Sequence, residues 1–587
     1  MTIGNHIRWS SLVFVGSLLV CIACAQAGEP EFRWVYLQQN LQVTENLPKI
    51  ETTLRRAAKA GYNGVVLADY KLNILDRVPD HYFKNAGRFR ELCRELKLEV
   101  IPSVCSFGYS SGILAHDPNL AEALPVRQTP FVVHGDVAKL EGGGTLVTGQ
   151  FEERRGHAFS GWNFQDEPGS GTFADDAVQH GGQSSLRIEN PPGIRGNRRV
   201  HKLITVRPWA QYHASAWIRT EGFESTGSTR MFAMSPAGRV LSHSNLGVRR
   251  DQDWTEHHVV FNSLDNSEVR FYLGVWDCGG GKLWIDDVRL VEEPLVNLVR
   301  RPGCPLLVQD ANGPTVYVEG RDFAELRDPQ LGTTPWKGEF DVYHQPPVLR
   351  LLPGSRIRDG QCLHVSYYHA VTIYDGQVPC SLSEPKVYEV VEDQVRRVQE
   401  LFRPNIYFLS HDEIRVACWS EPERQSGRTA GQQLAANVHR CVEIIRRINP
   451  KARLCIWSDM FDPSHNAVKD FYLVNGDLAG SWEGLPQDMI IVNWNSGKPA
   501  QSLPFFAQRG HVQVLAGYYD GPPERICEWL AAGRNLNGIR GVMYTTWRGD
   551  FSHLEAFAEH AWGQAVAASS PAVTALGDPA FEGHLNP

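Results

Sequence analysis

Hydrophobic residues recur along the first hundred positions with two alternating spacings. Short apolar runs occur at 34–37, 64–69 and 98–105, and the segments between them, 47–60 and 80–97, have apolar positions at a helical spacing. Parallel strands need a long crossover between them, and a helix of this length supplies one. The pattern therefore predicts strand–helix units of a parallel sheet.

This pattern stops between about residues 131 and 341. Short alternating runs separated by Gly, Pro and turn residues replace it, which is typical of an antiparallel sandwich. The successive segments SAWIRT, WTEHHVVF and LWIDDVRL resemble the jelly-roll carbohydrate-binding modules of secreted glycosidases. A sandwich that only braces its neighbour is the alternative. Six tryptophans of this region could stack on sugar or pack in a core: Trp162, Trp209, Trp217, Trp254, Trp276 and Trp284.

The strand–helix pattern resumes beyond the sandwich, with helices expected at 384–402 and 428–447. Five further strands are expected at 406–409, 453–457, 489–494, 512–516 and 541–547. With the three earlier strands they predict a (β/α)8 TIM barrel interrupted by an inserted all-β, jelly-roll-like sandwich. The apolar run 363–369 is left outside this count, as a strand of either part.

The N-terminus predicts export. An apolar stretch from Leu12 to Ala25 is followed by Ala25-Gln26-Ala27, which fits a signal-peptidase site. Lipid modification of Cys24 is the alternative, although Cys21 stands where a lipobox needs an aliphatic residue. The predicted divisions are a signal peptide at 1–27, barrel at 28–129, inserted sandwich at 130–345, barrel at 346–564 and a tail at 565–587. No transmembrane span is expected in the exported chain, since no later segment is long and apolar enough.

Composition excludes some function classes. The formal net charge of -8 and the lack of any basic run give no reason to expect a nucleic-acid partner. No C-x-x-C pair follows the signal and no H-E-x-x-H motif occurs, so we expect no metal and no cofactor. The sixteen Trp and eighteen Tyr suit an oligosaccharide or polysaccharide partner, because flat rings pack against apolar sugar faces.

Chemistry in such barrels lies at the carboxyl ends of the strands. The run 406–409 leads directly into Asp412 and Glu413. A glycosidase needs an acid for the departing oxygen and a second group at the oxocarbenium-like centre; in the substrate-assisted variant the sugar's own 2-acetamido oxygen attacks. Two adjacent carboxylates suit that variant, one orienting the amide and the other acting as acid and base.

The later strand ends add aromatic and acidic residues that could enclose one sugar ring. In chain order they are Trp457, Asp459, Trp494, Tyr518, Asp520 and Trp547. Chance or core packing can explain any one of these aromatics, but four successive strand ends favour a pocket.

The second barrel half resembles family 20 of the glycoside hydrolases, the β-N-acetylhexosaminidases. A helix ending in Leu401-Phe402 leads through a strand to Ser410-His411-Asp412-Glu413, similar to that family's H-x-G-G-D-E motif. The resemblance implies that Asp412 orients the acetamido group and that Glu413 is the general acid/base. The neighbouring His411 is expected to contact substrate.

The same resemblance assigns the other strand-end residues. Trp457 and Trp494 would line the acetamido pocket, and Trp547 would lie beneath the sugar ring. Tyr518 and Asp520 match the family's Y-x-D, whose tyrosine bonds the acetamido oxygen, which makes Tyr518 a third catalytic residue. Asp459, beside Trp457, completes the predicted substrate-binding set.

Three departures from the family's pattern concern the outer hydroxyls of the sugar. The first strand, 34–38, lacks the family's arginine, Tyr109 stands in place of a histidine, and Gly549 in place of a glutamate. We therefore expect the linkage chemistry to be kept, while the terminal sugar stays open between N-acetylglucosamine, N-acetylgalactosamine and others.

Two other functions remain open. A conventional retaining glycosidase would pair Glu413 with a separate nucleophile such as Asp520 or Glu483, about 5–5.5 Å away. A catalytically silent carbohydrate-binding protein would explain the missing arginine and glutamate. The substrate-assisted glycoside hydrolase is favoured, because it gives both Asp412 and Glu413 a task.

Overall fold

The computed structural model describes residues 30–142, 144–149, 151–191, 193–374, 376–518 and 520–563. The predicted signal peptide at 1–27, with the alternative lipid site Cys24, and the predicted tail at 565–587 lie outside these residues. Within the described ranges, no helix has both the length and the apolar character needed to cross a bilayer.

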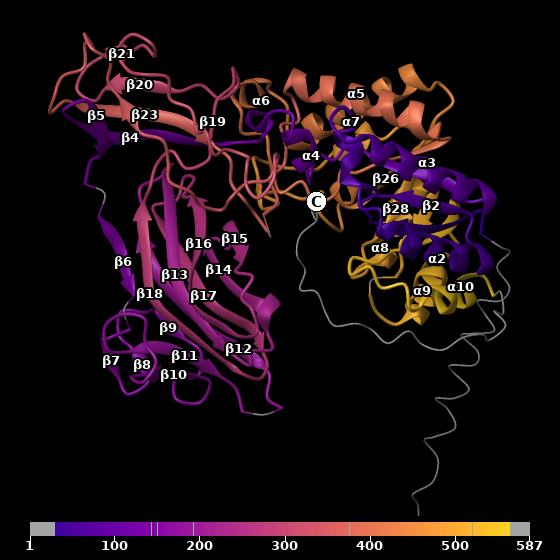
Figure 1. The fold of residues 1–587 in the computed structure, drawn as a ribbon, viewed down its shortest axis with the longest axis horizontal. Coiled ribbons are helices and arrows are strands. Elements are labelled where there is room, and N and C mark those ends of the chain that lie inside the picture. Colours follow the sequence, from indigo (N-terminus) through magenta and orange to yellow (C-terminus); the bar gives the residue numbers. More distant parts are fainter. Residues whose placement is uncertain are drawn as a thin grey trace, which may run out of the picture.

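Eight parallel strands close into a barrel on one side of the molecule (Figure 1), as the strand count predicts. In order around the barrel they are β1 (Phe32–Leu37), β2 (Gly64–Leu67), β3 (Glu99–Val104), β24 (Ile406–Leu409), β26 (Arg453–Trp457), β28 (Ile490–Asn493), β29 (Gln513–Leu515) and β30 (Ile539–Tyr544). The last strand pairs with the first, so the barrel has no free edge.

Helices follow most of the barrel strands. They are α2 (Asn46–Lys59), α3 (Asp80–Glu95), α5 (Pro385–Phe402), α7 (Ala430–Ile448), α8 (Pro499–Gln508), α9 (Ile526–Gly533) and α10 (Leu554–Trp562). Between β26 and β28, residues 458–489 are all described and form only the 3-10 turns η4 (Asp459–Phe461) and η5 (Ser481–Gly484) with the short strand β27 (Leu473–Val474). The barrel therefore departs from a strict alternation of eight strands and eight helices.

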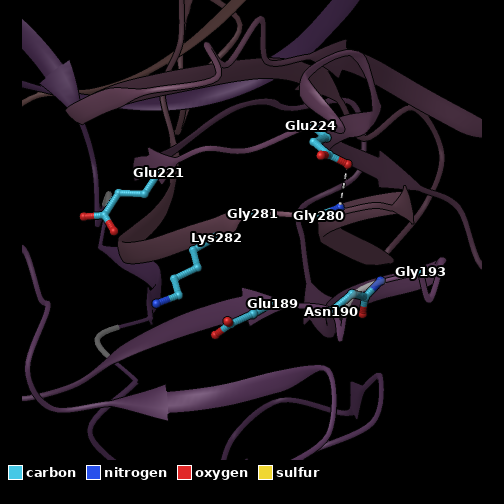
Figure 2. Close-up of a pocket in the computed structure, with 8 residues that line it drawn as sticks. All are labelled: Glu189, Asn190, Gly193, Glu221, Glu224, Gly280, Gly281 and Lys282. Carbon is cyan, nitrogen blue, oxygen red and sulfur yellow. Dashed lines mark hydrogen bonds between the residues drawn. The ribbon is translucent and has the colours of Figure 1, made fainter.

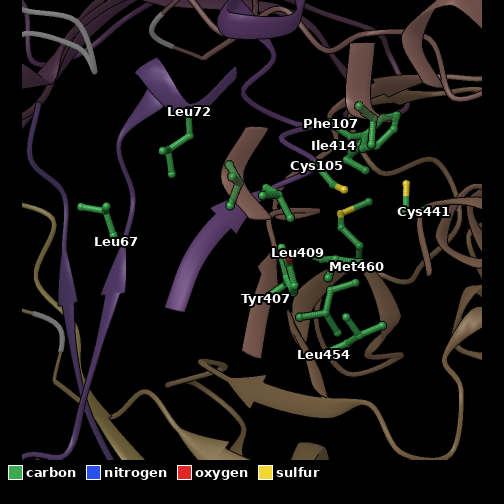
Figure 3. Packing of buried hydrophobic residues seen from close by; sticks show 14 of the residues in the cluster. Leu67, Leu72, Cys105, Phe107, Tyr407, Leu409, Ile414, Cys441, Leu454 and Met460 are labelled. Atoms are coloured by element: carbon green, nitrogen blue, oxygen red, sulfur yellow. The ribbon is translucent and has the colours of Figure 1, made fainter. Parts of the chain in front are cut away.

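Barrel side chains alternate between two cores, as strand geometry requires. Tyr36, Phe408 and Trp457 point to the barrel interior. Their neighbours Tyr407 and Leu409 point outward and pack beneath the helices, in the layer that Figure 3 shows. Which layer a residue joins decides whether it can reach a site at the mouth of the barrel.

The ten described cysteines are free thiols.

The insertion between β3 and β24 contains an antiparallel sandwich, as expected. One sheet has the order β10 (Thr172–Asp175), β11 (Ser185–Glu189), β18 (Lys282–Glu292), β13 (Gln211–Glu221) and β16 (Gln252–Asn262), with β6 (Thr145–Gly149) paired to β18. The other has the order β15 (Val240–Asn245), β14 (Thr229–Met234), β17 (Glu268–Cys278), β12 (Gly196–Thr205) and β9 (Phe164–Gln165). One apolar core fills the space between them.

A third sheet, with a core of its own, was not predicted. Its order is β21 (Val316–Tyr317), β20 (Leu307–Asp310), β23 (Cys362–His369), β4 (Leu124–His134), β5 (Val137–Leu140) and β22 (Leu349–Arg350), with β19 (Leu298–Val299) on β23. The predicted boundaries at 130 and 345 fall inside it. The run 363–369 belongs to this sheet, not to the barrel or the sandwich. The central strands of this sheet, β4 and β23, lie on either side of the sandwich in the sequence. Local hydrophobic patterns do not reveal a pairing between such distant segments.

The remaining short elements complete the description. They are α4 (Ser111–Leu114), α6 (Glu421–Gln425), β7 (Arg154–Arg155), β8 (Ala158–Phe159), β25 (Val416–Ala417), η1 (Tyr70–Asn73), η2 (Pro118–Leu120), η3 (Thr226–Ser228) and η6 (Pro523–Arg525).

The sandwich packs directly on the barrel loops. Its core includes Ile373, Trp419 and Leu473, which come from loops before α5 and after β24 and β26. Arg239, in the turn between β14 and β15, donates hydrogen bonds to the Tyr472 carbonyl (2.5 Å) and the Val474 carbonyl (2.7 Å). The shared core couples the sandwich to the loops at the barrel mouth.

This coupling predicts that a loop residue carries stability for both parts. Leu473 is fully buried, so we expect Leu473→Ala to lower the free energy of unfolding by about 2–5 kcal/mol. The matched control Leu307→Ala, at a side chain 37% exposed, should cost about 1 kcal/mol or less. Urea denaturation followed by fluorescence measures both, and equal losses would contradict a shared core.

Candidate functional site

Two adjacent carboxylates follow β24 at the carboxyl end of the barrel. The loop after β3 passes so close that a Cβ on Gly108 would lie 1.9 Å from the Asp412 backbone oxygen. Only glycine permits this approach. The close packing brings Tyr109 alongside the carboxylates, and its hydroxyl donates to Glu413 Oε2 at 2.6 Å.

Asp412 and Asp459 form a pair of enclosed carboxyls. Asp412 accepts the Ser410 hydroxyl at 2.7 Å, and Asp459 accepts the Glu413 backbone N–H at 2.8 Å. Burial and the neighbouring Asp459 charge raise the pKa of Asp412 to about 7. Burial likewise raises the pKa of Asp459 to about 7. The pair can therefore hold or release a proton near neutral pH.

Glu413 lies beside a positive charge, whereas Asp412 and Asp459 lie beside other carboxyls. The Arg415 Nη2 lies 2.6 Å from Glu413 Oε1, and the Arg415 side chain is only 3% exposed. Gln377 accepts a second guanidinium hydrogen bond at 2.9 Å. Burial lowers the pKa of Arg415, but the Glu413 charge and Tyr109 outweigh it and the pKa is raised.

Aromatic rings surround the guanidinium and the carboxyls. Arg415 Cζ lies 4.2 Å from the ring centroid of Tyr374 and 5.3 Å from that of Tyr472. The Trp494 indole N–H donates to Asp459 Oδ1 at 3.2 Å, and the His465 ring lies 4.5 Å from the Trp494 ring.

The barrel interior supplies a floor beneath the carboxyls. Trp457 lies 5.7 Å from Tyr36 and 5.9 Å from Trp547 between ring centroids, and Tyr36 lies 5.3 Å from Trp547. Burial and the nearby Asp412 charge raise the pKa of Tyr36. The structure thus brings together Asp412, Glu413, Asp459, Trp457, Trp494 and Trp547 of the predicted set.

His411 is placed elsewhere, contrary to its predicted substrate contact. Its side chain is fully buried in the outer layer, where Nε2 bonds Asn437 of α7 at 2.9 Å and the ring packs 4.9 Å from Phe107. Burial lowers its pKa to about 4. Strand alternation gives the reason, because His411 and Asp412 point to opposite sides of the chain.

Tyr518 also lies outside the group. It is 2% exposed and stacks on Tyr544 with centroids 4.3 Å apart, in the layer beneath α9 and α10. This position contradicts contact with a sugar at the barrel mouth. The following residue, Tyr519, lies outside the described residues.

Asp520 and Glu483 do not supply a second free carboxylate beside Glu413. Asp520 accepts the Thr546 hydroxyl, the Trp547 N–H at 2.8 Å and the Arg548 N–H at 3.2 Å, so it holds the loop after β30. Glu483 is exposed on η5, which packs against α7 on the outside of the barrel.

Several site residues were missed from the sequence: Tyr36, Tyr374, Arg415, His465 and Tyr472. Arg415 had the only local signal, since it lies two positions after Glu413. Tyr36 belongs to the first strand, in which the sequence indicated only that the resembling family's arginine is missing. The others lie on loops whose approach depends on the tertiary fold.

A separate recess of about 500 Å³ opens at one end of the six-stranded sheet (Figure 2). It is lined by Glu189, Asn190, Gly193, Glu221, Glu224, Gly280, Gly281 and Lys282. It contains no aromatic ring and none of the predicted site residues. Among the described residues, no group of three or more His, Cys, Asp or Glu side chains is arranged to hold a metal.

Comparison with known proteins gives partial matches. No family model matches the chain. A beta-hexosaminidase of Emericella nidulans is 23% identical over 154 residues, which are 25% of this chain and 22% of that protein. The chain thus matches less than a quarter of that relative's length.

Solved structures that are similar to this chain cover about a quarter of it. A family 16 carbohydrate-binding module is 20% identical with a TM-score of 0.20, over 25% of this chain and 100% of the module. A xylan-binding domain from Paenibacillus barcinonensis is 15% identical with a TM-score of 0.20, over 26% and 96%. Since these TM-scores are far below 0.5, they carry no argument about function.

The paired carboxyls predict a pH dependence of stability. Unfolded aspartates lose their protons near pH 4, whereas Asp412 and Asp459 keep theirs to about pH 7. The native state binds more protons in that window, so the free energy of unfolding contributed by the pair falls as pH rises from about 4 to about 7.

Asp459→Asn should make this fall smaller, because one titrating group is removed and the other loses a like charge. The control Asp136→Asn, at a side chain 73% exposed, should leave it unchanged. Urea denaturation across the pH range measures the slope, and identical slopes in wild type and Asp459→Asn would refute the assignment.

Proposed function

We propose that the chain is an exported glycoside hydrolase that releases terminal β-linked N-acetylhexosamine by a substrate-assisted, retaining mechanism. The observation that carries this proposal is that Asp412 and Glu413 lie side by side after β24, close to Asp459 and its hydrogen-bond partner Trp494. The partial match to a beta-hexosaminidase agrees with it. The (β/α)8 TIM barrel remains the fold class that we propose for the catalytic part.

Asp412 is suited to orient the 2-acetamido group. Its ionised form would accept the amide N–H, so that the amide oxygen attacks the anomeric carbon and no protein nucleophile is needed. The Asp412 side chain is only partly exposed, and it also accepts the Ser410 hydroxyl at 2.7 Å, which holds the carboxyl in one orientation. Trp494, which is partly exposed, offers an apolar wall for the acetamido methyl group, and the buried Trp457 packs behind it with ring centroids 6.5 Å apart.

Glu413 is the proposed acid/base. It would protonate the departing oxygen in the first step and activate water in the second. Tyr109 and Arg415 fix the carboxyl by contacts of 2.6 Å each. Glu413 must leave Arg415, or share it with the substrate, before it can give a proton.

A conventional retaining mechanism has less support. Asp520 already accepts hydrogen bonds from the loop after β30, and Glu483 lies outside the barrel. Gly549, with a φ of +66°, stands where the resembling family has a glutamate, and no described atom lies within 4 Å of the point where its Cβ would be. This openness leaves the terminal sugar undefined.

The decisive measurement is release of p-nitrophenol from aryl glycosides. We expect turnover of 2-acetamido sugars but not of their 2-hydroxy counterparts, and a loss of about 10²–10⁴-fold in kcat for Asp412→Asn and Glu413→Gln. Equal turnover of 2-hydroxy sugars would point to a protein nucleophile. Sugar binding without turnover would favour the silent binding protein.

Tyr518→Phe is a matched control for this experiment. Tyr518 is buried in the layer outside the barrel and its side chain bonds that of Tyr544, so we expect a change in kcat of less than about threefold. A loss as large as that of Glu413→Gln would restore Tyr518 to the catalytic set.

A further inference from the structure

One row of aromatic rings crosses the whole five-stranded sheet. Phe164, His201, Tyr272, Phe232 and His243 are direct cross-strand partners, one from each of β9, β12, β17, β14 and β15. Successive ring centroids are 5.3, 4.8, 5.0 and 6.0 Å apart. At a strand spacing of about 4.8 Å, the row is roughly 19 Å long.

The row lies on the outer face of the sandwich. Its neighbours along the strands, such as Val200, Met231 and Phe271, point into the sandwich core, so the rings themselves point away from it. Phe164 and the adjacent Leu203 are each 39% exposed. His201, Tyr272 and Phe232 are half-buried and His243 is buried. A row of rings that is partly open to solvent on one sheet face is a candidate binding surface.

The row ends at the candidate active site. The His243 ring stacks on Tyr374 with centroids 5.1 Å apart, and the His243 carbonyl accepts the Tyr374 N–H at 3.0 Å. Tyr374 in turn packs on Arg415, which contacts Glu413. In Figure 1, β14 and β15 lie on the side of the sandwich nearer the barrel. Ring contacts therefore run without a break from the exposed β9 end of the row to His243, Tyr374 and Arg415, of which His243 and Arg415 are buried.

Three arginines share this face. Arg199, Arg230 and Arg270 each lie two positions from a ring of the row on the same strand, so they point the same way. Arg199 and Arg230 lie 5.6 and 5.7 Å from the Trp276 ring. Within the described residues only Arg199 forms an ion pair, with Asp166 at 2.8 Å. Asp166 and Glu268 share the face with the three arginines, so its balance is one positive charge, in a chain whose net charge is -8.

We propose that this face binds an extended, negatively charged glycan and leads it into the carboxylate site. The rings offer apolar surface to the C–H faces of sugars, and the guanidinium groups pair with carboxylates or sulfates. The inference rests on the proposed function, because it assumes that a single glycan occupies both the aromatic sheet face and the carboxylate site. It names the substrate class as an acidic polysaccharide that contains N-acetylhexosamine.

The test measures binding in the full-length Asp412→Asn chain, so that turnover does not interfere. Isothermal titration calorimetry compares a hyaluronan hexasaccharide, with alternating carboxylates, and a neutral chitin hexasaccharide. We expect hyaluronan to bind at least about tenfold more tightly. Adding Tyr272→Ala should weaken hyaluronan binding at least about tenfold, while Trp254→Ala, on the other sheet, should change it less than about twofold.

Two further variants cover the case in which Tyr272→Ala fails to fold. Tyr272→Phe keeps the ring and should keep the affinity, and Arg230→Gln should weaken binding and reduce its dependence on salt. The proposal is overturned if both hexasaccharides bind equally, if Arg230→Gln binds normally, or if poly-glutamate binds as tightly as hyaluronan.

The two proposals fail in different ways. If wild type releases no acetamido sugar but Tyr272→Ala still abolishes hyaluronan binding, the proposed reaction is wrong and the binding face stands. If aryl glycosides are cleaved while the row variants bind hyaluronan normally, only the binding face is wrong.

Discussion

A buried guanidinium fixes the geometry of the carboxylate site. Arg415 lies beneath Tyr374 and Tyr472, with its charge balanced by Glu413 at 2.6 Å. A buried cation without a partner is unfavourable by several kcal/mol, so Arg415 holds Glu413 in place until a bound substrate joins or replaces the contact. The loops that enclose Arg415 are therefore constrained together with the proposed acid/base.

Those loops depend on the sandwich. Arg239 donates hydrogen bonds to the backbone carbonyls of Tyr472 and Val474. The His243 carbonyl in β15 accepts the Tyr374 N–H. Both rings over Arg415 are thus held from the sandwich side. An insertion that only added a binding surface could be joined by a flexible linker, whereas this one supplies part of the wall around the proposed catalytic residues.

Much of this arrangement could be predicted from the chain, because parallel barrel strands are buried on both faces and appear as short apolar runs. Their number and the position of Asp412, Glu413 and Asp459 at strand ends follow from that pattern. The third sheet could not be predicted, since its pairing of β4 with β23 spans the whole sandwich. The contact of Arg415 with two loop tyrosines depends on the same long-range packing.

Side-chain direction explains which of the predicted residues lie together after the barrel strands and which do not. His411 points outward to Asn437, and strand alternation would turn Glu413 outward as well. Glu413 instead has a φ of +51°, a left-handed conformation that is uncommon for residues other than glycine. Its N–H bond to Asp459 supports this conformation. That local turn lets Asp412 and Glu413 both face the barrel mouth, although they are adjacent in the sequence. Strained backbone conformations of this kind are common at functional sites.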